Sequence, residues 1–299
     1  MSKSFYEFKT VRDMVRYGVS QFNQANLYFG HGSDNAWDEA VYLVLFALNL
    51  PLDNLEPFLD ARLLESEKKR CLDLIETRVK KRTPLAYLTG ESWLQGYRFI
   101  CDKRVIVPRS PISELLVQQL SPWLEDPEED LDILDMCTGS GNLAIIAALN
   151  FPFSQVDAVD LSDYAIRLAQ RNVEMYQLQS RVNIIQSDLF TDLPLKKYDF
   201  IIANPPYVNS TSMKNLPSEY QREPVMALEG GEDGMDFVRK ILHKSADYLK
   251  DNGFILLEIG NEYENFLTAF PSISPTFLET ETTQECIVLL SRDDLLMLD

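Results

Sequence analysis

The chain has 299 residues, of which 45% are hydrophobic and 25% are charged. These values are typical of a globular protein and exclude collagen-like and largely disordered chains. The net charge of −18 at pH 7 argues against a protein whose main task is to bind a phosphate backbone, because such proteins present Lys- and Arg-rich surfaces. The charge fits either general solubility or attraction to a basic protein partner.

The sequence predicts a cytoplasmic protein without a membrane span. Its longest strongly apolar run, residues 40–50, is shorter than the roughly 20 residues needed to cross a bilayer. Residues 1–10 lack the apolar core of a signal peptide. The four cysteines are widely separated in the sequence, and no CxxC pair or nearby histidine indicates a disulfide framework or a metal site. We therefore expect no bound metal.

The first part of the chain has helical periodicity. Apolar residues recur at helical spacing over residues 11–22 and again over 72–79. Asn35 can cap a second helix over residues 36–50, because its side chain accepts a hydrogen bond from a free backbone N–H of the first turn. We assign residues 1–84 to a small helical domain that recognises the substrate.

A change to β-type composition follows at residues 87–108. Gly96 separates two short apolar runs there, Trp93-Leu94 and 97–100, which is the pattern of a β-hairpin. The sequence therefore predicts that residues 85–108 form a β-hairpin linker between two domains.

From residue 131 onward, strand patterns alternate with helix patterns, including a helix expected at 235–250. This alternation predicts a mainly parallel sheet covered by helices on both faces. We assign residues 109–299 to this α/β domain. The strands are expected at 131–137, 155–160, 182–187, 198–204 and 254–260, with 286–290 as an antiparallel last strand.

A glycine-rich turn follows the first of these strands. In the sequence TGSG (138–141), Gly139 and Gly141, together with Ala144, have the G-x-G-x-x-G/A spacing of a nucleotide-binding turn. Glycine allows the sharp turn and the close approach of a ligand. Asp160 ends the next strand, where its carboxylate can accept hydrogen bonds from two ribose hydroxyls. These features alone suit NAD, S-adenosylmethionine or a purely structural turn.

Two further features favour S-adenosylmethionine. Asp135 lies within the first strand, where its negative charge would oppose a pyrophosphate but suit the amino group of a methionine moiety. The sequence Asn-Pro-Pro-Tyr (204–207) directly follows the fourth strand. Because ligands bind at the carboxyl ends of parallel strands, this motif is expected to face the same crevice as the glycine turn.

The Asn-Pro-Pro-Tyr motif suits methyl transfer to a planar nitrogen. An amide or exocyclic amino nitrogen is a poor nucleophile, because its lone pair is delocalised. The Asn204 side-chain oxygen and the Pro205 carbonyl can each accept one N–H, which fixes the nitrogen and favours charge developing on it. Pro205 and Pro206 restrict the turn, and Tyr207 can stack on the amide plane. We predict that these four residues are catalytic.

Segments spread over nearly the whole chain resemble one family. They are D-M-C-T-G-S-G (135–141), Asp160, S-D-L-F (187–190), N-P-P-Y (204–207), R-T-P-L-A-Y-L-T-G-E (82–91) and E-P-V-M-A-L-E-G-G-E-D-G (223–234). Together they resemble the glutamine-amide methyltransferases, which include release-factor and ribosomal-protein enzymes. The resemblance implies S-adenosylmethionine as cofactor and a Rossmann-like class I methyltransferase fold with a seven-stranded sheet. The cofactor-binding residues that it implies are Asp135, Thr138, Gly139, Gly141, Asp160, Asp188 (near the adenine) and Asn204.

The details resemble the branch of this family that acts on large-subunit ribosomal protein L-three. Release-factor enzymes typically have P-R-P-[DE]-T-E, whereas residues 108–113 read P-R-S-P-I-S. Cys137 and H-G-S-D-N-A-W-D-E-A (31–40) also resemble the L-three branch. The resemblance implies N5-methylation of one glutamine in a basic protein, which suits the charge of −18, and no direct binding of nucleic acid. The sequence E-T-T-Q-E-C (281–286) departs from the family's glycine-rich turns, so the shape of the final hairpin is open.

Other interpretations stay open at this point. They are glutamine methylation of release factors, amino methylation of a nucleic acid, a nicotinamide-dependent oxidoreductase and a non-catalytic binding module. Nucleic-acid enzymes share the Asn-Pro-Pro-Tyr geometry but need a basic surface, which the charge disfavours. Arg109 either lines the cofactor crevice or pairs with a carboxylate, and His31 and His243 are expected to be structural.

Overall fold

The computed structural model of the protein describes residues 8–298, which form two compact units. The helical unit contains the chain up to Ser92 together with Pro217–Arg222, and the α/β unit contains the rest. Most of the N-terminal segment for which no signal peptide is expected lies outside the described residues. No helix within residues 8–298 has both the length and the apolar character needed to cross a membrane.

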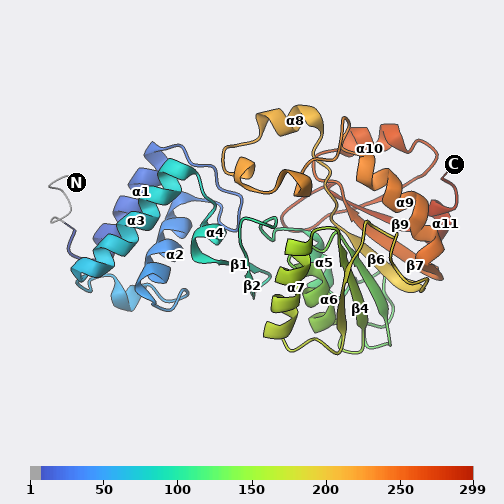
Figure 1. The fold of residues 1–299 in the computed structure, drawn as a ribbon, viewed down its shortest axis with the longest axis horizontal. Helices are drawn as coiled ribbons and strands as arrows, with labels where there is room; N and C mark the ends of the chain where they lie inside the picture. The colour runs from blue at the N-terminus through green and yellow to red at the C-terminus, as the bar shows by residue number, and fades with distance from the viewer. Residues whose placement is uncertain (1–7, 299) are drawn as a thin grey trace. The chain divides into compact units, whose positions relative to one another are not determined.

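The helical unit has an apolar core between its helices, which Figure 1 shows as blue and cyan ribbons. Thr10 and Asn35 cap the first two helices through their side chains, as predicted for Asn35. Met14, Leu43 and Ile75 are almost fully buried where the helices face one another. The helices are α1 (Val11–Gln24), α2 (Ala36–Leu48), α3 (Glu65–Lys81) and α4 (Leu85–Thr89), with a short 3-10 helix η2 (Glu56–Phe58).

The predicted linker contains a hairpin, as expected, but its first residues, 85–89, form a short helix instead. Strands β1 (Glu91–Leu94) and β2 (Tyr97–Ile100) form a two-stranded sheet. Gln95 and Gly96, between the strands, both have positive φ angles, of 51° and 77°. Two positive φ angles are the requirement of a two-residue type I′ turn, which explains the glycine.

The α/β unit contains a seven-stranded sheet of order β5-β4-β3-β6-β7-β9-β8. The first five strands in this order are parallel, and β9 is antiparallel to both of its neighbours. This confirms the mainly parallel sheet with an antiparallel last strand. The strands are β3 (Asp132–Met136), β4 (Gln155–Asp160), β5 (Val182–Gln186), β6 (Tyr198–Ala203), β7 (Leu249–Glu258), β8 (Thr276–Leu278) and β9 (Ile287–Ser291).

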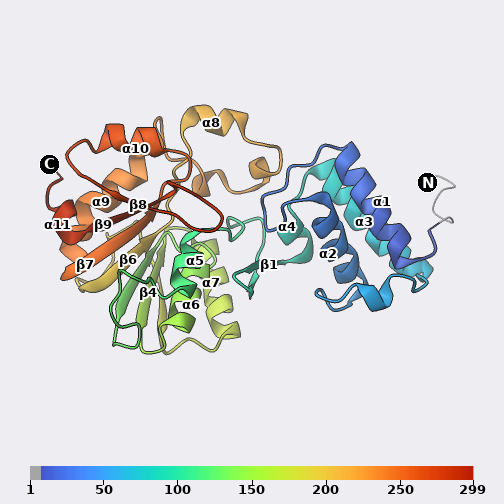
Figure 2. The same cartoon turned by 180° about the vertical axis from the view of Figure 1, so that it is seen from behind.

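Helices cover both faces of this sheet, as expected. Ile133 of β3 packs against one group of helices, and the next residue, Leu134, packs against the other, because successive side chains of a strand point to opposite faces. One face carries α5 (Ile112–Val117), α6 (Asn142–Asn150) and α7 (Asp163–Met175), and the other carries α9 (Asp236–Tyr248), α10 (Tyr263–Ala269) and α11 (Arg292–Leu295). Figure 2 shows the α/β unit from behind.

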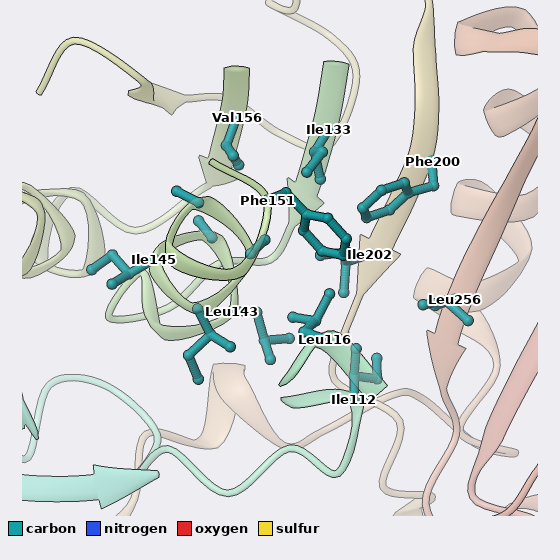
Figure 3. Close-up of a cluster of buried hydrophobic side chains, with 14 of the residues drawn as sticks. Ile112, Leu116, Ile133, Leu143, Ile145, Phe151, Val156, Phe200, Ile202 and Leu256 are labelled. Atoms are coloured by element: carbon teal, nitrogen blue, oxygen red, sulfur yellow. The ribbon is translucent and has the colours of Figure 1, made fainter. Parts of the chain in front are cut away.

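Aromatic rings fill the core on the α6 side of the sheet. Phe151, which follows α6, and Phe200 of β6 meet edge to face, with their ring centroids 5.7 Å apart. Figure 3 shows Phe151 beside Phe200 and Ile202, below Ile133. Offset and edge-to-face contacts of this kind add to the stability that burial provides, so this core stabilises the sheet on which the site is built.

Two predicted helix ends were wrong by two residues. The helix expected at 36–50 ends at Leu48, before an Asn49 in the left-handed conformation. The helix expected at 235–250 ends at Tyr248, because Leu249 begins β7 and pairs with Tyr198 of β6. The connection between β6 and α9 contains α8 (Ser210–Asn215) and the 3-10 helices η3 (Tyr220–Arg222) and η4 (Val225–Ala227). In the final hairpin, the backbone N–H of Glu281 donates to the Glu114 carboxylate of α5, so the loop in which the sequence departs from the family is bonded to a helix.

Candidate functional site

A cavity of about 470 Å³ lies at the carboxyl ends of strands β3, β4, β5 and β6. Its volume is within the range of about 300–1,000 Å³ that small-molecule sites occupy. Residues at or just after these strand ends line it, including Cys137, Asp160, Asp188 and Asn204. Parallel sheets bind ligands at this edge, so the position agrees with the sequence-based expectation.

The turn after β3 has the backbone of a ligand-binding loop. Cys137, Gly139 and Gly141 all have positive φ angles, of 62°, 58° and 78°. Gly139 lines the cavity, whereas a Cβ atom on Gly141 would lie 3.1 Å from the Cβ atom of Ala169 in α7. The first glycine therefore leaves room for a ligand, and the second allows α6 and α7 to approach closely.

Asp135 closes this turn onto the start of α6. Its Oδ2 atom accepts hydrogen bonds from the Thr138 hydroxyl at 2.5 Å and from the Ala144 N–H at 3.0 Å. Its Oδ1 atom is buried without a hydrogen-bond partner among the described residues. Burial, aided by the nearby charge of Asp160, raises the pKa of Asp135 to about 7. Such a carboxyl group binds a proton readily and would be stabilised as an anion by a nearby cation.

Asp160 is held at the end of β4 by the backbone. Its Oδ2 atom accepts from the Gly139 N–H at 2.9 Å, and its Oδ1 atom accepts from the Ser162 N–H at 2.8 Å. Burial raises the Asp160 pKa despite these bonds. Each carboxylate oxygen has a further lone pair, so the side chain can also accept hydrogen bonds from a ligand in the cavity.

The cavity is strongly anionic. Its lining contains four carboxylates, and among the described lining residues Arg104 is the one cationic side chain. This arrangement favours a positively charged ligand, such as one that carries a sulfonium or an ammonium group. Burial also raises the pKa of the Cys137 thiol well above its ordinary value, so it is not a thiolate nucleophile. The carboxylates are Asp160, Asp188, Glu229 and Asp236.

The Asn-Pro-Pro-Tyr motif presents unpaired acceptors at the edge of the sheet. Asn204 and Pro206 line the cavity. Among residues 8–298, no side chain or backbone group hydrogen-bonds the Asn204 side chain or the Pro205 carbonyl oxygen. Polar groups left unpaired beside a cavity are suited to bind the N–H groups of a ligand.

Glycines of the loop at 229–234 pack against the backbone of this motif. A Cβ atom on Gly230 would lie 2.8 Å from the Pro206 carbonyl oxygen, and one on Gly234 would lie 2.2 Å from the Tyr207 carbonyl oxygen. Neither distance is sterically possible, so only glycine allows this close approach. The glycines of the E-G-G-E-D-G sequence indicate that another backbone segment packs closely there. The sequence alone did not show that this segment is the Asn-Pro-Pro-Tyr motif.

Tyr207 points away from the cavity. Its hydroxyl donates to the Glu258 Oε1 atom at 2.7 Å, and the Ser110 hydroxyl donates to the Oε2 atom at 2.5 Å. The Tyr207 ring lies against Gly260, where a Cβ atom would approach the ring to 2.3 Å. Tyr207 does not line the cavity, and its expected stacking on a substrate amide stays a prediction.

The sequence-predicted site residues divide into two groups. Five of them line the cavity, namely Gly139, Asp160, Asp188, Asn204 and Pro206. The other five shape the surrounding backbone without lining it, namely Asp135, Thr138, Gly141, Pro205 and Tyr207. The individual roles assigned to these residues in binding and catalysis stay predictions.

Sequence reasoning missed several parts of the lining. Among them are Arg104–Ile106, after the hairpin, Asp236 at the start of α9, and residues 224–231, which we call the wall segment. Of the two roles considered for Arg109, the structure shows the pairing with a carboxylate. The Arg109 guanidinium donates to both oxygens of Glu223, at 2.7 and 2.8 Å. Because Glu223 also accepts from the Val107 N–H at 2.8 Å, it joins the start of the wall segment to the chain after the hairpin.

Comparisons with known proteins agree with this site. The family model of the methyltransferase small domain matches residues 111–219. Ribosomal protein uL3 glutamine methyltransferases from Bordetella pertussis and Burkholderia pseudomallei are 57% and 52% identical to the chain. The first alignment covers 97% of both proteins, and the second covers 99% of this chain and 98% of the relative. The relative from Neisseria gonorrhoeae is 49% identical, with 97% of both proteins covered.

Solved structures show the same fold. The crystal structure of the hMettl16 catalytic domain in complex with a MAT2A 3'UTR hairpin has a TM-score of 0.51 at 17% identity. The match covers 75% of this chain and 80% of that one. At this identity the similarity supports the class I methyltransferase fold and nothing about the substrate.

The resemblance inferred from the motifs is thereby confirmed, and the release-factor and nucleic-acid alternatives are not favoured. The chain is a methyltransferase that uses S-adenosylmethionine as methyl donor, and the anionic cavity with its glycine turn fits that cofactor. Relatives about half identical to it over nearly their full length share one name. The chain belongs to the family of ribosomal protein uL3 glutamine methyltransferases.

Proposed function

We propose that the protein methylates the side-chain amide nitrogen of a glutamine in ribosomal protein uL3. The observation that carries this proposal is the pair of unpaired acceptors, the Asn204 side chain and the Pro205 carbonyl, beside the anionic cavity. A primary amide has two N–H groups, and two acceptors at one turn can bind both. The names of the close relatives support uL3 as the protein that carries this glutamine.

The residues of the chain would act by orientation and electrostatics. When bound, S-adenosylmethionine supplies a methyl group on a positively charged sulfur. The Asn204 oxygen and the Pro205 carbonyl would fix the amide nitrogen and favour the positive charge that develops on it. No side-chain nucleophile is needed, which agrees with the protonated Cys137 thiol. The fixed Asp160 carboxylate would accept hydrogen bonds from the ribose, and Asp188 would lie near the adenine.

We assign substrate recognition to the helical unit, with residues 1–84 as its predicted domain. Every described residue that lines the cofactor cavity belongs to the α/β unit, and we assign the protein partner to the helical unit. The net charge of −18 would attract a basic protein. All four cysteines are free thiols, which suits a reducing compartment, and we place the reaction in the cytoplasm.

A competition assay tests the proposal. The purified protein and S-adenosylmethionine are incubated with unmethylated uL3 and an unmethylated release factor, and the products are read by peptide mass spectrometry. One added methyl group on a glutamine of uL3 alone is the expected result. Methylation of the release factor alone would move the assignment to the other branch of the family, and methylation of neither protein would contradict the proposed substrate.

An asparagine pair tests the catalytic assignment in the same assay. We expect Asn204→Ala to lower the rate of methylation by about 100- to 1,000-fold, the usual effect of losing one preorganised electrostatic contact. Asn215→Ala is the matched control, because Asn215 is exposed at the end of α8 and its side chain donates to the Thr211 carbonyl within that helix. Equal rates for the two variants would contradict the role of Asn204.

A further inference from the structure

Residues 217–222 belong to the helical unit, although the chain on both sides of them belongs to the α/β unit. We call Pro217–Arg222 the anchor segment. The Asn-Pro-Pro-Tyr motif precedes it, with residues 208–216 between them, and the wall segment (224–231) begins just after it. A contact that fixes the anchor segment therefore restrains the chain on both sides, including residues that line the cavity.

Glu219 is the central residue of the anchor segment. Its side chain is 2% exposed, and its Oε1 atom accepts three hydrogen bonds from residues of the helices and their loops. The donors are the Tyr28 N–H at 3.2 Å, the Arg78 Nη1 atom at 3.3 Å and the Arg82 Nη1 atom at 3.2 Å. One carboxylate thus joins the anchor segment to the end of α3 and to the loop before α2.

The two arginines are themselves fixed by the helical unit. Arg78 is 1% exposed and donates to the buried carboxylate of Glu39 in α2 and, at 3.1 Å, to the Tyr28 carbonyl. Arg82 donates to the Asn26 carbonyl at 3.0 Å as well as to Glu219. Two arginines therefore face two buried carboxylates, so the charges in this cluster balance, and the arginines are rigid partners for Glu219.

The carboxylate of Glu219 is charged near neutral pH. Burial alone would raise the pKa of Glu219. Backbone hydrogen bonds and the two arginines lower it by more, so the Glu219 pKa lies below its ordinary value. A charged acceptor forms stronger hydrogen bonds than a neutral one. The link between the anchor segment and the helices is therefore present under physiological conditions.

Tyr220 provides a second contact of the anchor segment. Its ring centroid lies 4.4 Å from that of His31 and 5.6 Å from that of Tyr28. A Cβ atom on Gly30 would lie 2.9 Å from the Tyr220 hydroxyl oxygen, so glycine leaves the space that the tyrosine occupies. His31 and Gly30 belong to the loop between α1 and α2, so Tyr220 packs against this loop; the structural role expected for His31 stays a prediction.

We infer that Glu219 is a positioning residue for methyl transfer: by fixing the anchor segment to the helical unit, it holds the wall segment and the Asn-Pro-Pro-Tyr motif in their working geometry. Glu223, the first residue after the anchor segment, is fixed in turn by Arg109. The chain that leads into the wall segment is thus held at two residues, Glu219 and Glu223. Pro224, Met226 and Glu229, which follow, line the cavity, so freeing Glu219 would loosen one side of the cofactor site.

Glu219→Gln tests this role, with Glu39→Gln as the matched control. Both residues are buried carboxylates bonded to Arg78, so both changes disturb the same arginine and are expected to lower thermal stability. Only Glu219 lies in the anchor segment, and after loss of the Glu39 charge it still has Arg82 and the Tyr28 N–H as partners. Activity is compared at a temperature at which circular dichroism shows both variants fully folded.

We expect Glu219→Gln to lower kcat by about ten- to a hundredfold, the effect of a small misplacement of catalytic groups, and to weaken S-adenosylmethionine binding several-fold. Glu39→Gln should leave both quantities near those of the parent protein. Arg82→Gln should shift them in the same direction as Glu219→Gln, and it carries less risk of misfolding because the Arg82 side chain is 29% exposed. Equal kcat values for the Glu219 and Glu39 variants would overturn the inference.

The kcat measurement rests on the proposed function, since it uses uL3 as substrate. The binding measurement, by calorimetry with S-adenosylmethionine alone, does not. If the parent protein leaves uL3 unmethylated, the proposed substrate fails while the binding comparison still decides the role of Glu219. If the parent protein is active and cofactor affinity is the same in all variants, the restraint of the wall segment is wrong.

Discussion

The hydroxyl group of Tyr207 and the Oε1 atom of Glu258 are 2.7 Å apart and form a partly buried hydrogen bond. This bond fixes the last residue of the Asn-Pro-Pro-Tyr motif to the end of β7, the strand next to β6. Burial raises the Glu258 pKa and raises the Tyr207 pKa well above its ordinary value. The tyrosine is therefore a neutral donor throughout the physiological range.

Tyr207→Phe removes this bond and keeps the ring. We expect it to lower the free energy of unfolding by about 1–3 kcal/mol, because Glu258 then loses one of its two hydrogen-bond donors in a buried site. The measurement is urea denaturation followed by circular dichroism. Methylation should fall less than in Asn204→Ala, since Tyr207 does not line the cavity. A larger loss of activity than in Asn204→Ala would instead support direct stacking on the substrate.

Gly260→Ala tests the packing of the Tyr207 ring. The new methyl group would lie 2.3 Å from the ring, so the motif must shift, and we expect lower stability together with a large loss of activity. Gly90→Ala is the control, because Gly90 also has a positive φ, 76° against 53° for Gly260, but has open space at its Cβ position. If both variants lose the same activity, backbone strain and not the ring contact explains the effect.

Asp160→Ala should weaken the binding of S-adenosylmethionine and leave the fold intact. Each lost hydrogen bond between a ribose hydroxyl and the charged carboxylate is expected to cost about 1.5–3 kcal/mol. Isothermal titration calorimetry measures the change, with Asp163→Ala as control, since Asp163 is exposed in the next helix and pairs with Arg167 on the surface. An unchanged affinity in Asp160→Ala would show that the ribose lies elsewhere.

Asp135 should make the protein without cofactor sensitive to pH. Its folded-state pKa of about 7 lies above the ordinary 3.8, so the folded state binds more protons than the unfolded state between these values. The contribution of Asp135 to the free energy of unfolding therefore falls as pH rises from 3.8 to about 7. Thermal denaturation measured between pH 3.8 and about 7 should show that stability decreases less with rising pH in Asp135→Asn than in the parent protein.

Cofactor binding should show the opposite dependence on pH. A cation in the cavity favours the ionised form of Asp135, so affinity for S-adenosylmethionine should increase as pH rises through about 7, with release of a proton. Calorimetry in buffers of different ionisation enthalpy detects that proton. The same pH profile in Asp135→Asn would exclude Asp135 as its source.

The local features of the fold were predictable because their causes are local. Gly96 lies in a turn that requires a positive φ, Asn35 caps its own helix, and each parallel strand is a short apolar run with a turn after it. The carboxyl ends of these strands had to share one edge of the sheet. The sequence therefore located Gly139, Asp160 and Asn204 correctly around one cavity.

The remaining features depend on contacts between residues distant in sequence. Arg78 meets Glu219 across 141 positions, and Arg109 meets Glu223 across 114. No periodicity or spacing indicates which carboxylate pairs with which arginine. The direction of the Tyr207 ring likewise depends on Glu258 and on the space at Gly260, so the pattern Asn-Pro-Pro-Tyr could identify the turn but not the side to which the tyrosine points.

The discontinuity of the helical unit affects how this enzyme could be re-engineered. Exchanging residues 1–92 for those of a relative with a different protein substrate would separate Arg78 and Arg82 from the carboxylate that they bind. A functional chimera would need to carry residues 217–222 from the same donor, inserted into the recipient as a second exchanged block. Transfer of substrate preference between members of this family is therefore expected to require the exchange of both segments together.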